Sequence, residues 1–396
     1  MDIPTKPMSL KWFSLFSPPI LWPLYGISLY EILSMEGIDT SLFTNNKIVG
    51  SIWRKRFGVK TVDRYSKESL IMNYRLYGYP ETIIEALNRL SSLDSKEDLL
   101  ITINGYNAFI YTTSGFDIQY LNKPQNKIKK MNIDIPGLYI YDNPWDLLKT
   151  YLNLDLKRIL KFILSRLSFE EVYDGLYVKG NVDINDRYTY IDSSGGWILL
   201  FDDVNLEGFN FLKGPLVVGG KTLLSNSKIH NSIIGPVCKI GSEVSDSILL
   251  GYSNSAHFGY IGHSLIGYWV NIGAGTVFSD LKNTYGPMKF WFMGNRYDLG
   301  VIKFGSIVGD YAKTSINTSI YGGRFIGLSS HVSGLVSKSI PPFKIFDGWH
   351  DKEENMHVDK AIEIARRMYV RRGVNFINDE EKLFREVFKE LKDETA

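Results

Sequence analysis

The chain has 396 residues, 44% of them hydrophobic, which is enough for two or three domains with a sizeable core. The formal net charge is only +2, so a nucleic-acid-binding surface is not expected. The single cysteine, Cys238, excludes an intramolecular disulfide and a cysteine-rich zinc site. The N-terminal stretch has no uninterrupted run of roughly 18 apolar residues. We therefore expect a cytoplasmic protein with no signal peptide and no membrane span.

Residues 1–150 predict an α/β domain. The spacing of apolar residues indicates helices over 28–37 and 81–93. A short apolar run over 98–103 indicates a buried strand. Strands that alternate with helices are typical of a Rossmann-like layer.

An amphipathic pattern over 143–168 predicts one long helix that leads out of this domain. We expect residues 151–175 to form the link to the following repeats.

An Ile-Gly or Val-Gly pair recurs through residues 229–342, often at a spacing of six residues or a multiple of six. This period fits neither an α-helix nor a simple alternating strand, and it is the signature of a β-helix. We predict a β-helix over 176–349 and a helical segment over 350–396. One series of predicted inward positions, in which only the third residue is polar, is Ile302, Val308, Thr314, Ile320, Ile326 and Val332.

Two stretches are predicted to interrupt the repeat, Leu249–Gly259 and Phe278–Gly300. Loops that project from a rigid scaffold often carry function. His257 and His263 lie in or beside the first stretch, and histidine is the side chain best suited to accept a proton near neutral pH. A structural or surface role is the commoner alternative for either histidine taken alone.

The sequence contains no GxxxxGK[ST] loop, no GxGxxG after a strand and no HExxH motif. Because HExxH and a Cys/His cluster are both absent, a dedicated transition-metal site is not expected. The basic run Arg366–Arg372 (RRMYVRR) could bind an anion, but the solvated face of an amphipathic helix is the commoner origin of such a run.

The segment from His257 to Thr276, which ends in NIGAGT (Asn271–Thr276), resembles the acetyltransferase domain of bifunctional N-acetylglucosamine-1-phosphate uridylyltransferase/glucosamine-1-phosphate acetyltransferase. The residues that match this family are Ala256, His257, Tyr260, Gly262 and Asn271–Thr276. A variant branch of sugar nucleotidyltransferase relatives resembles the chain more closely, through Gly251–Asn254, His257, Gly259, Gly262, Asn271, Gly273, Ala274 and Ser279–Tyr285.

This resemblance implies a left-handed parallel β-helix and a homotrimer with active sites between subunits. It implies that His257 is the general base that deprotonates a sugar amine for attack on acetyl-CoA. A sugar phosphate is the implied substrate, with acetyl-CoA as co-substrate at Gly273 and Ala274. The implied substrate-binding residues are Tyr260, Asn271, Lys282, Asn283 and Tyr285.

Asp280 departs from the family pattern, which has Asn at this position. A carboxylate adds negative charge where a phosphate is expected, so the resemblance does not identify the substrate. His263 is an alternative to His257 as the base.

The N-terminal domain departs further from an active nucleotidylyltransferase. It lacks the glycine-rich loop, and Asn104-Gly105-Tyr106 follows the predicted strand where the family has a magnesium carboxylate. We expect a degenerate domain that does not catalyse nucleotidyl transfer efficiently. Mg²⁺ is expected as a cofactor only if the domain retains that activity.

Three functions therefore compete. The first is an acetyl-CoA-dependent sugar-phosphate acyltransferase in nucleotide-sugar biosynthesis. The second is a sugar-1-phosphate nucleotidylyltransferase, and the third is a non-catalytic sugar-nucleotide-binding or regulatory subunit.

Overall fold

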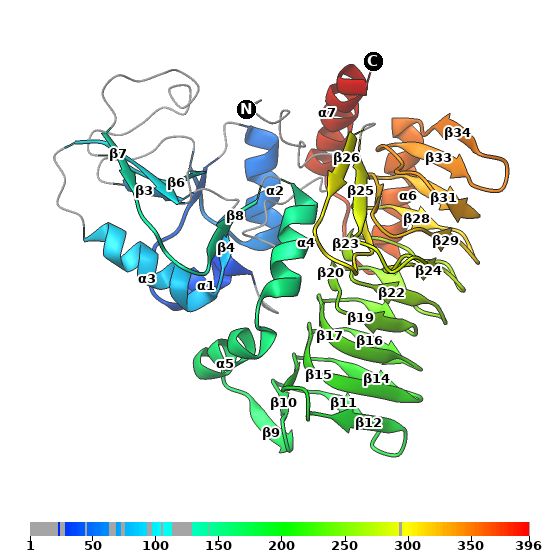
Figure 1. The fold of residues 1–396 in the computed structure, drawn as a ribbon, viewed down its shortest axis with the longest axis horizontal. Helices are drawn as coiled ribbons and strands as arrows, with labels where there is room; N and C mark the ends of the chain where they lie inside the picture. Colours follow the sequence, from blue (N-terminus) through cyan, green and yellow to red (C-terminus); the bar gives the residue numbers. More distant parts are fainter. Residues whose placement is uncertain are drawn as a thin grey trace. The chain divides into compact units, whose positions relative to one another are not determined.

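Figure 1 shows a computed structural model of the chain, in which a stack of short strands follows an α/β region. The structure describes residues 23, 28–43, 46–62, 69–72, 76–92, 97–103, 106–112, 129–141, 143–292 and 295–395. These residues divide into two compact units, one within 28–142 and the other within 143–396.

The first unit is α/β, as predicted. Its four-stranded sheet has the order β3-β6-β5-β7, and β6 runs antiparallel to both of its neighbours. The sheet is therefore mixed and not a wholly parallel Rossmann layer. The elements of this unit are α1 (Leu29–Met35), β1 (Leu42–Phe43), α2 (Lys47–Phe57), β2 (Thr61–Val62), β3 (Ser69–Met72), β4 (Leu76–Gly78), α3 (Pro80–Ser91), β5 (Leu99–Ile103), β6 (Tyr106–Thr112), β7 (Lys129–Asn132) and β8 (Leu138–Ile140).

The predicted single helix over 143–168 is wrong. The structure has two helices, α4 (Pro144–Asn153) and α5 (Leu156–Arg166). Leu154 adopts an extended backbone, and the Asp155 side chain caps the second helix by accepting from the amide of Lys157.

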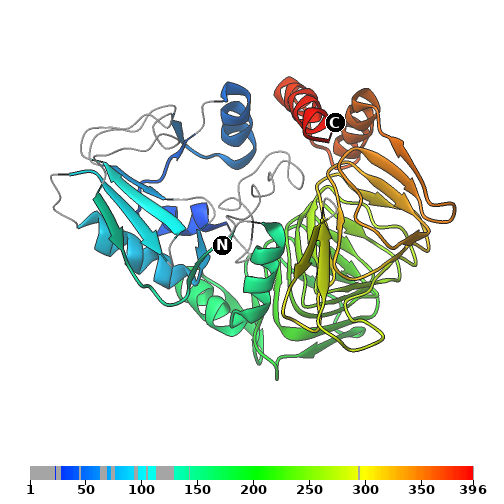
Figure 2. The same cartoon turned by 45° about the horizontal axis from the view of Figure 1, so that its top comes forward.

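The second unit is a parallel β-helix, which confirms the predicted repeat architecture (Figures 1 and 2). Its strands form three faces. Face A contains β10 (Leu176–Val178), β13 (Ile198–Leu200), the second part of β15 (Asn210–Val218), the second part of β17 (Lys228–Ile234), β20 (Ile248–Gly251), β23 (Leu265–Tyr268), β27 (Ser306–Val308) and β30 (Arg324–Ile326). The strand β9 (Glu170–Tyr173) pairs antiparallel with β10.

Face B contains the first parts of β15 and β17, together with β12 (Thr189–Asp192), β19 (Glu243–Ser245), β22 (Tyr260–Gly262), β24 (Val277–Phe278), β29 (Ser319–Ile320) and β32 (Leu335–Val336). Face C contains β11 (Asp183–Ile184), β14 (Asn205–Glu207), β16 (Leu223–Ser225), β18 (Lys239–Ile240), β21 (Asn254–Ser255), β28 (Lys313–Thr314), β31 (His331–Ser333) and β33 (Lys344–Asp347), with β34 (Lys352–Asn355) antiparallel at its end.

Each coil runs through face B, face A and face C in turn. We call the three edges the B–A corner (residues 231, 246 and 263), the A–C corner (252, 269 and 311) and the C–B corner (256–259, 273–276 and 315–318). One coil commonly advances the chain by 15 to 18 residues, as from Lys228 to Glu243 and from Ser306 to Arg324.

Aliphatic side chains from all three faces fill the interior of the β-helix. Thr314 interrupts them, but its buried hydroxyl accepts from the backbone amide of Gly273 (2.9 Å) and bonds the Thr276 hydroxyl (2.8 Å). The predicted inward position of Ile302 is wrong, because its side chain is 56% exposed.

The predicted interruption over Leu249–Gly259 is also wrong. The strands β20 and β21 lie in this stretch and pair in register with the coils on either side. The loss of period arises from a C–B corner that is longer by two residues, since Lys239 to Asn254 spans 15 residues but Glu243 to Tyr260 spans 17.

The predicted interruption over Phe278–Gly300 is confirmed. The chain leaves the β-helix after β24 and forms the hairpin of β25 (Lys289–Phe292) and β26 (Asn295–Asp298). Trp145 of α4 packs on this hairpin, with ring centroids 4.7 Å from Phe290 and 4.9 Å from Tyr297.

The C-terminal segment forms α6 (Val358–Val370) and α7 (Asn378–Thr395), which confirms the predicted helical tail. Tyr369 of α6 stacks on Trp269 of the A–C corner at 4.2 Å. The Tyr369 hydroxyl bonds the Tyr311 hydroxyl (2.8 Å) and donates to Oε1 of Glu380 (3.0 Å). Among the residues that the structure describes, no helix is long and apolar enough to cross a membrane.

Candidate functional site

His263, Asp280 and Tyr260 form a hydrogen-bonded polar cluster on the β-helix. Nδ1 of His263 lies 2.7 Å from Oδ2 of Asp280, and the Tyr260 hydroxyl donates to the same oxygen at 3.0 Å. The side chains of His263 and Asp280 are only 12% and 11% exposed. The hydrogen bonds therefore fix the imidazole, the phenol and the carboxylate relative to one another.

The backbone of the B–A corner positions this cluster. His263 has a φ of 44°, as the corner requires, and its amide donates to the carbonyl of Ser245 at 2.9 Å. Asp280 stands where the chain begins its excursion, and its carbonyl accepts from Phe304 at 2.8 Å as the chain returns. Gly262 leaves the space for the cluster, because a Cβ there would lie 2.5 Å from the Tyr260 hydroxyl and 2.6 Å from Asp280 Oδ2.

A second carboxylate faces the other side of the His263 ring. Oδ2 of Asp246 lies 3.8 Å from Nε2 of His263 and 3.8 Å from Nδ1 of His230. Asn231 donates to Asp246 Oδ1 at 2.6 Å and holds that carboxylate in place. His263 thus lies between two acidic side chains from the coils before and after it.

The charges of the cluster follow from its burial and hydrogen bonds. Burial opposes ionisation of Asp280, but the hydrogen bond and charge of His263, with Tyr260 and Lys303, bring the pKa of Asp280 below its ordinary value. Burial and the nearby Asp280 raise the pKa of Tyr260 well above its ordinary value. Asp280 is therefore the acceptor and Tyr260 the neutral donor, an arrangement that can orient an imidazole for proton transfer or bind a polar substrate group.

His257 lies on a different edge of the β-helix, in the C–B corner. Its side chain is exposed, as is that of the adjacent Phe258 (71%). Within the described part of the chain, the His257 ring makes no hydrogen bond or ion pair.

Gly273 and Ala274 lie in the same corner as His257, one coil further along. The amide of Gly275 donates to the carbonyl of Phe258 at 2.8 Å, which joins the two turns directly. A Cβ at Gly273 would lie 2.5 Å from the backbone of Ser315, so the coils approach closely here. The structure thus brings His257, Gly273 and Ala274 together, apart from His263.

The other predicted substrate residues are dispersed over the β-helix. Asn271 lies on face C, bridged to Asn254 and Lys313. Lys282 donates to the carbonyl of Pro287, and the Asn283 and Tyr285 side chains are exposed in the excursion. Only Tyr260 joins the His263 cluster.

Asp246, His230 and Asn231 were missed at the sequence level. The spacing of three of these residues could have revealed the cluster. Asp246, His263 and Asp280 follow one another at intervals of 17 residues, which is the length of one coil in this region. Residues separated by one coil stand on adjacent rungs and face the same way.

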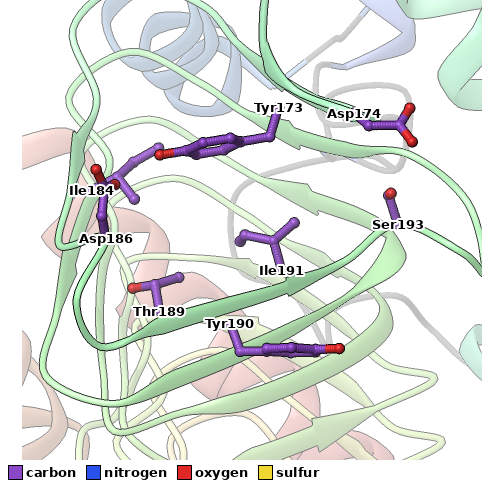
Figure 3. Close-up of a pocket in the computed structure, with 8 residues that line it drawn as sticks. All are labelled: Tyr173, Asp174, Ile184, Asp186, Thr189, Tyr190, Ile191 and Ser193. Atoms are coloured by element: carbon purple, nitrogen blue, oxygen red, sulfur yellow. The ribbon is translucent and has the colours of Figure 1, made fainter.

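A separate pocket of about 450 Å³ opens at the first coils (Figure 3). It is lined by aromatic, aliphatic and acidic or hydroxyl side chains and by no basic one, namely Tyr173, Asp174, Ile184, Asp186, Thr189, Tyr190, Ile191 and Ser193. The pKa of the Tyr173 phenol is raised by its hydrogen bond to Asp186. This lining is unsuited to a phosphate.

The predictions about metal ligation and nucleotidyl transfer concern segments that the structure describes only in part. The described residues include no group of three or more His, Cys, Asp or Glu side chains placed to hold a metal. Asn104-Gly105 and most of the segment expected to carry the glycine-rich loop lie outside the described residues.

Comparison with known proteins identifies relatives in sugar-nucleotide metabolism. No protein-family profile matches the chain. A bifunctional sugar-1-phosphate nucleotidylyltransferase/acetyltransferase of Sulfurisphaera tokodaii is 26% identical over 67% of this chain and 67% of its own length. The bifunctional protein GlmU of Methanocaldococcus jannaschii is 25% identical over 56% of this chain and 61% of its own length. That of Methanococcus vannielii is 33% identical over 25% of this chain and 24% of its own.

The match therefore spans about two thirds or less of the length of these curated relatives. Among solved structures, the polySia-specific acetyltransferase NeuO is 15% identical, with a TM-score of 0.25, over 51% of this chain and 99% of its own. AntD, an N-acyltransferase from Bacillus cereus, is 13% identical, with a TM-score of 0.24, over 46% of this chain and 91% of its own. The names of the curated relatives confirm the predicted resemblance and support the prediction of a transferase.

Proposed function

We propose that this protein is an acyl-CoA-dependent sugar acyltransferase of nucleotide-sugar biosynthesis. More finely, we propose that it transfers the acetyl group of acetyl-CoA to the amine of an amino-sugar phosphate. The proposal is supported by the β-helix, by the curated relatives that carry both transferase names, and by the C–B corner.

The C–B corner is the observation that carries the proposal. An exposed imidazole, His257, stands one coil from the closely packed backbone of Gly273 and Ala274, and the hydrogen bond from Gly275 to Phe258 joins the two turns. A thioester needs close backbone approach and a donor for its developing oxyanion. An attacking amine needs a base beside it.

In the proposed reaction the neutral sugar amine attacks the thioester carbonyl. The C–N bond forms and the C–S bond breaks, His257 takes the proton that the amine loses, and the thiolate of CoA is protonated as it leaves. An exposed base is suited to a site that a second copy of the chain completes, and we propose the homotrimer on the same ground.

The B–A corner offers the alternative base. Asp280 lies 2.7 Å from Nδ1 of His263 and can orient its ring. Among the described residues of one chain, His257 has no such carboxylate partner. His263 is also much less exposed than His257, and its ring lies between Asp246 and Asp280. These contacts suit a group that binds a substrate amine or hydroxyl better than one that meets acetyl-CoA.

The acidic side chains of the B–A corner also limit which part of the substrate can bind there. An anionic phosphate is disfavoured beside Asp246 and Asp280, whereas a protonated or neutral amino group is favoured there. In the alternative in which His263 is the base, the amino group of the substrate, and not its phosphate, faces the B–A corner. The loop residues Lys282, Asn283 and Tyr285 remain candidates for the phosphate end of the substrate.

The N-terminal unit is proposed to serve assembly or sugar binding, without efficient nucleotidyl transfer. Mg²⁺ is needed only if that transfer survives. Release of pyrophosphate from UTP or dTTP and a sugar-1-phosphate at a rate comparable to an active nucleotidylyltransferase would contradict this part of the proposal.

The decisive experiment measures thiol release from acetyl-CoA with glucosamine-1-phosphate. His257→Ala should lower kcat by about 100-fold or more, as removal of a general base does, without changing the oligomeric state. His350→Ala is the matched control, because His350 is an exposed histidine of the same β-helix unit (78% exposed). Unchanged turnover in His257→Ala, with loss in His263→Ala, would transfer the base to the B–A corner.

A further inference from the structure

Face C carries a row of polar side chains that the acyl-transfer proposal leaves unexplained. Lys239, Asn254, Asn271, Lys313 and His331 are register partners on successive coils. Residues in register on a parallel sheet project to the same side. The adjacent positions Ile240, Ile272 and Val332 are buried in the core, so the row faces outward.

The C-terminal segment adds a guanidinium to this row. Arg372, just after α6, donates to Oδ1 of Asn254. Met368 of α6 reaches the next part of the row, where its sulfur lies 2.8 Å from Nζ of Lys313. The carbonyl of Tyr311, at 3.3 Å, is the other contact of this amine.

These basic groups have no carboxylate partner among the described residues. The contacts of Lys313 are a thioether and one carbonyl, and that of Arg372 is an amide oxygen. Burial lowers the pKa of Lys313 to about 7, and burial together with Lys313 lowers the pKa of His331 to about 4. Protonation of Lys313 and His331 is therefore unfavourable unless a negatively charged group binds beside them.

Two other arginines of the basic run behave differently. Arg366 pairs with Glu381, and Arg367 pairs with Glu363 on the exposed surface of the helices. The predicted solvated face thus accounts for these two residues. It does not account for Arg372, which faces the β-helix.

We infer that Asn271, Lys313 and Arg372 on face C form a binding site for a phosphate group. Asn271 is exposed and gives access to the row, Asn254 holds Arg372 in place, and His331 stands beside Lys313. A guanidinium, an ammonium and an amide offer several donors to one multi-oxygen anion, and phosphate uses more of them than a carboxylate does. The inference concerns binding and does not depend on acyl transfer.

The experiment measures binding to the full-length protein by calorimetry at constant ionic strength. The probes are inorganic phosphate, coenzyme A and glucosamine-1-phosphate, which distinguish a free anion, an acyl donor and a sugar substrate as the source of the phosphate. Lys313→Gln and Arg372→Gln should each weaken binding of at least one probe by about tenfold or more, the usual scale for one charged hydrogen bond. Arg367→Gln, which removes an exposed arginine that is paired with Glu363, should leave binding unchanged.

Lys313→Arg tests the site if Lys313→Gln fails to fold, because it keeps the charge and should retain most of the affinity. Asn271→Asp, at an exposed position, should weaken the same probe through charge repulsion. The inference is overturned if no probe binds the wild-type chain, or if the face C variants and Arg367→Gln bind equally well.

Discussion

Nδ1 of His263 lies 2.7 Å from Oδ2 of Asp280, although the two residues are 17 positions apart in the chain. One coil of the β-helix separates them, so the contact depends on the length of that coil. Asp280 is the residue that departs most clearly from the predicted family pattern. Its hydrogen bond to His263 explains why a carboxylate can be buried at this position.

Asp280→Asn should lower the free energy of unfolding by about 1–3 kcal/mol near neutral pH, because a buried carboxylate loses charged hydrogen bonds. The pKa of Asp280 is below its ordinary value in the folded chain, so its stabilisation is present above the unfolded pKa of about 4 and is lost as the pH falls through the folded pKa. The gap between wild type and variant in urea unfolding should therefore shrink below about pH 4.

Asp298→Asn is the control for this pH dependence, since Asp298 is 65% exposed and lies 3.6 Å from Arg296. It should change stability by less than about 1 kcal/mol at every pH. A gap for Asp280→Asn that stays constant from neutral pH to pH 3 would contradict the assignment of Asp280 as the ionised partner.

Gly262→Ala should disrupt the same cluster by steric overlap. The added Cβ would lie 2.5 Å from the Tyr260 hydroxyl and 2.6 Å from Asp280 Oδ2, so at least one of these groups must move. We expect destabilisation of about 1–3 kcal/mol, the usual cost of overpacking, measured by urea unfolding. Gly286→Ala, whose Cβ would contact only Thr284 Oγ1 at 3.8 Å, should be close to neutral.

Thr314→Val should be destabilising although it makes the inward row wholly apolar. The hydroxyl accepts from the Gly273 amide and bonds Thr276, and both partners would remain buried or half-buried without it. The expected loss is about 1–3 kcal/mol. Thr284→Val, at an exposed position, provides the control, and a Thr314→Val variant as stable as wild type would show that these hydrogen bonds contribute little.

Cys238 should resist alkylation in the folded chain. Its side chain is buried (1% exposed), and burial raises the pKa of the thiol to about 12, so little thiolate is present at neutral pH. Addition of a thiol reagent should yield almost no labelling in buffer and one label per chain in denaturant. Rapid labelling of the native protein would mean that the A–C side of the core opens readily.

The sequence predicted the repeat, the main helices and the candidate histidines because each of these leaves a local signal. Ser28 and Glu31 form the capping box of α1, and Gly37 follows that helix with a φ of 72°, as expected for a terminating glycine. The break between α4 and α5 escaped prediction because the apolar period continues across it, whereas the Asp155 cap acts on a single turn.

The grouping of site residues could not be predicted from local pattern. It depends on coil lengths, and a corner longer by two residues shifts every later residue relative to the six-residue count. The same shift made Leu249–Gly259 resemble an interruption. His257 and His263 are only six positions apart, but they lie at two different corners because the strand β22 stands between them.

The excursion between β24 and β27 leaves the stacking of the coils undisturbed. Val277 pairs with Tyr260 before the excursion, and Ile307 pairs with Leu265 after it, so the chain re-enters the coil that it left with its register intact. A segment inserted in this way can be lengthened, shortened or replaced without moving any other rung. The scaffold and the hairpin can therefore diverge independently, and relatives that share the coils can differ in the chemistry of this one loop.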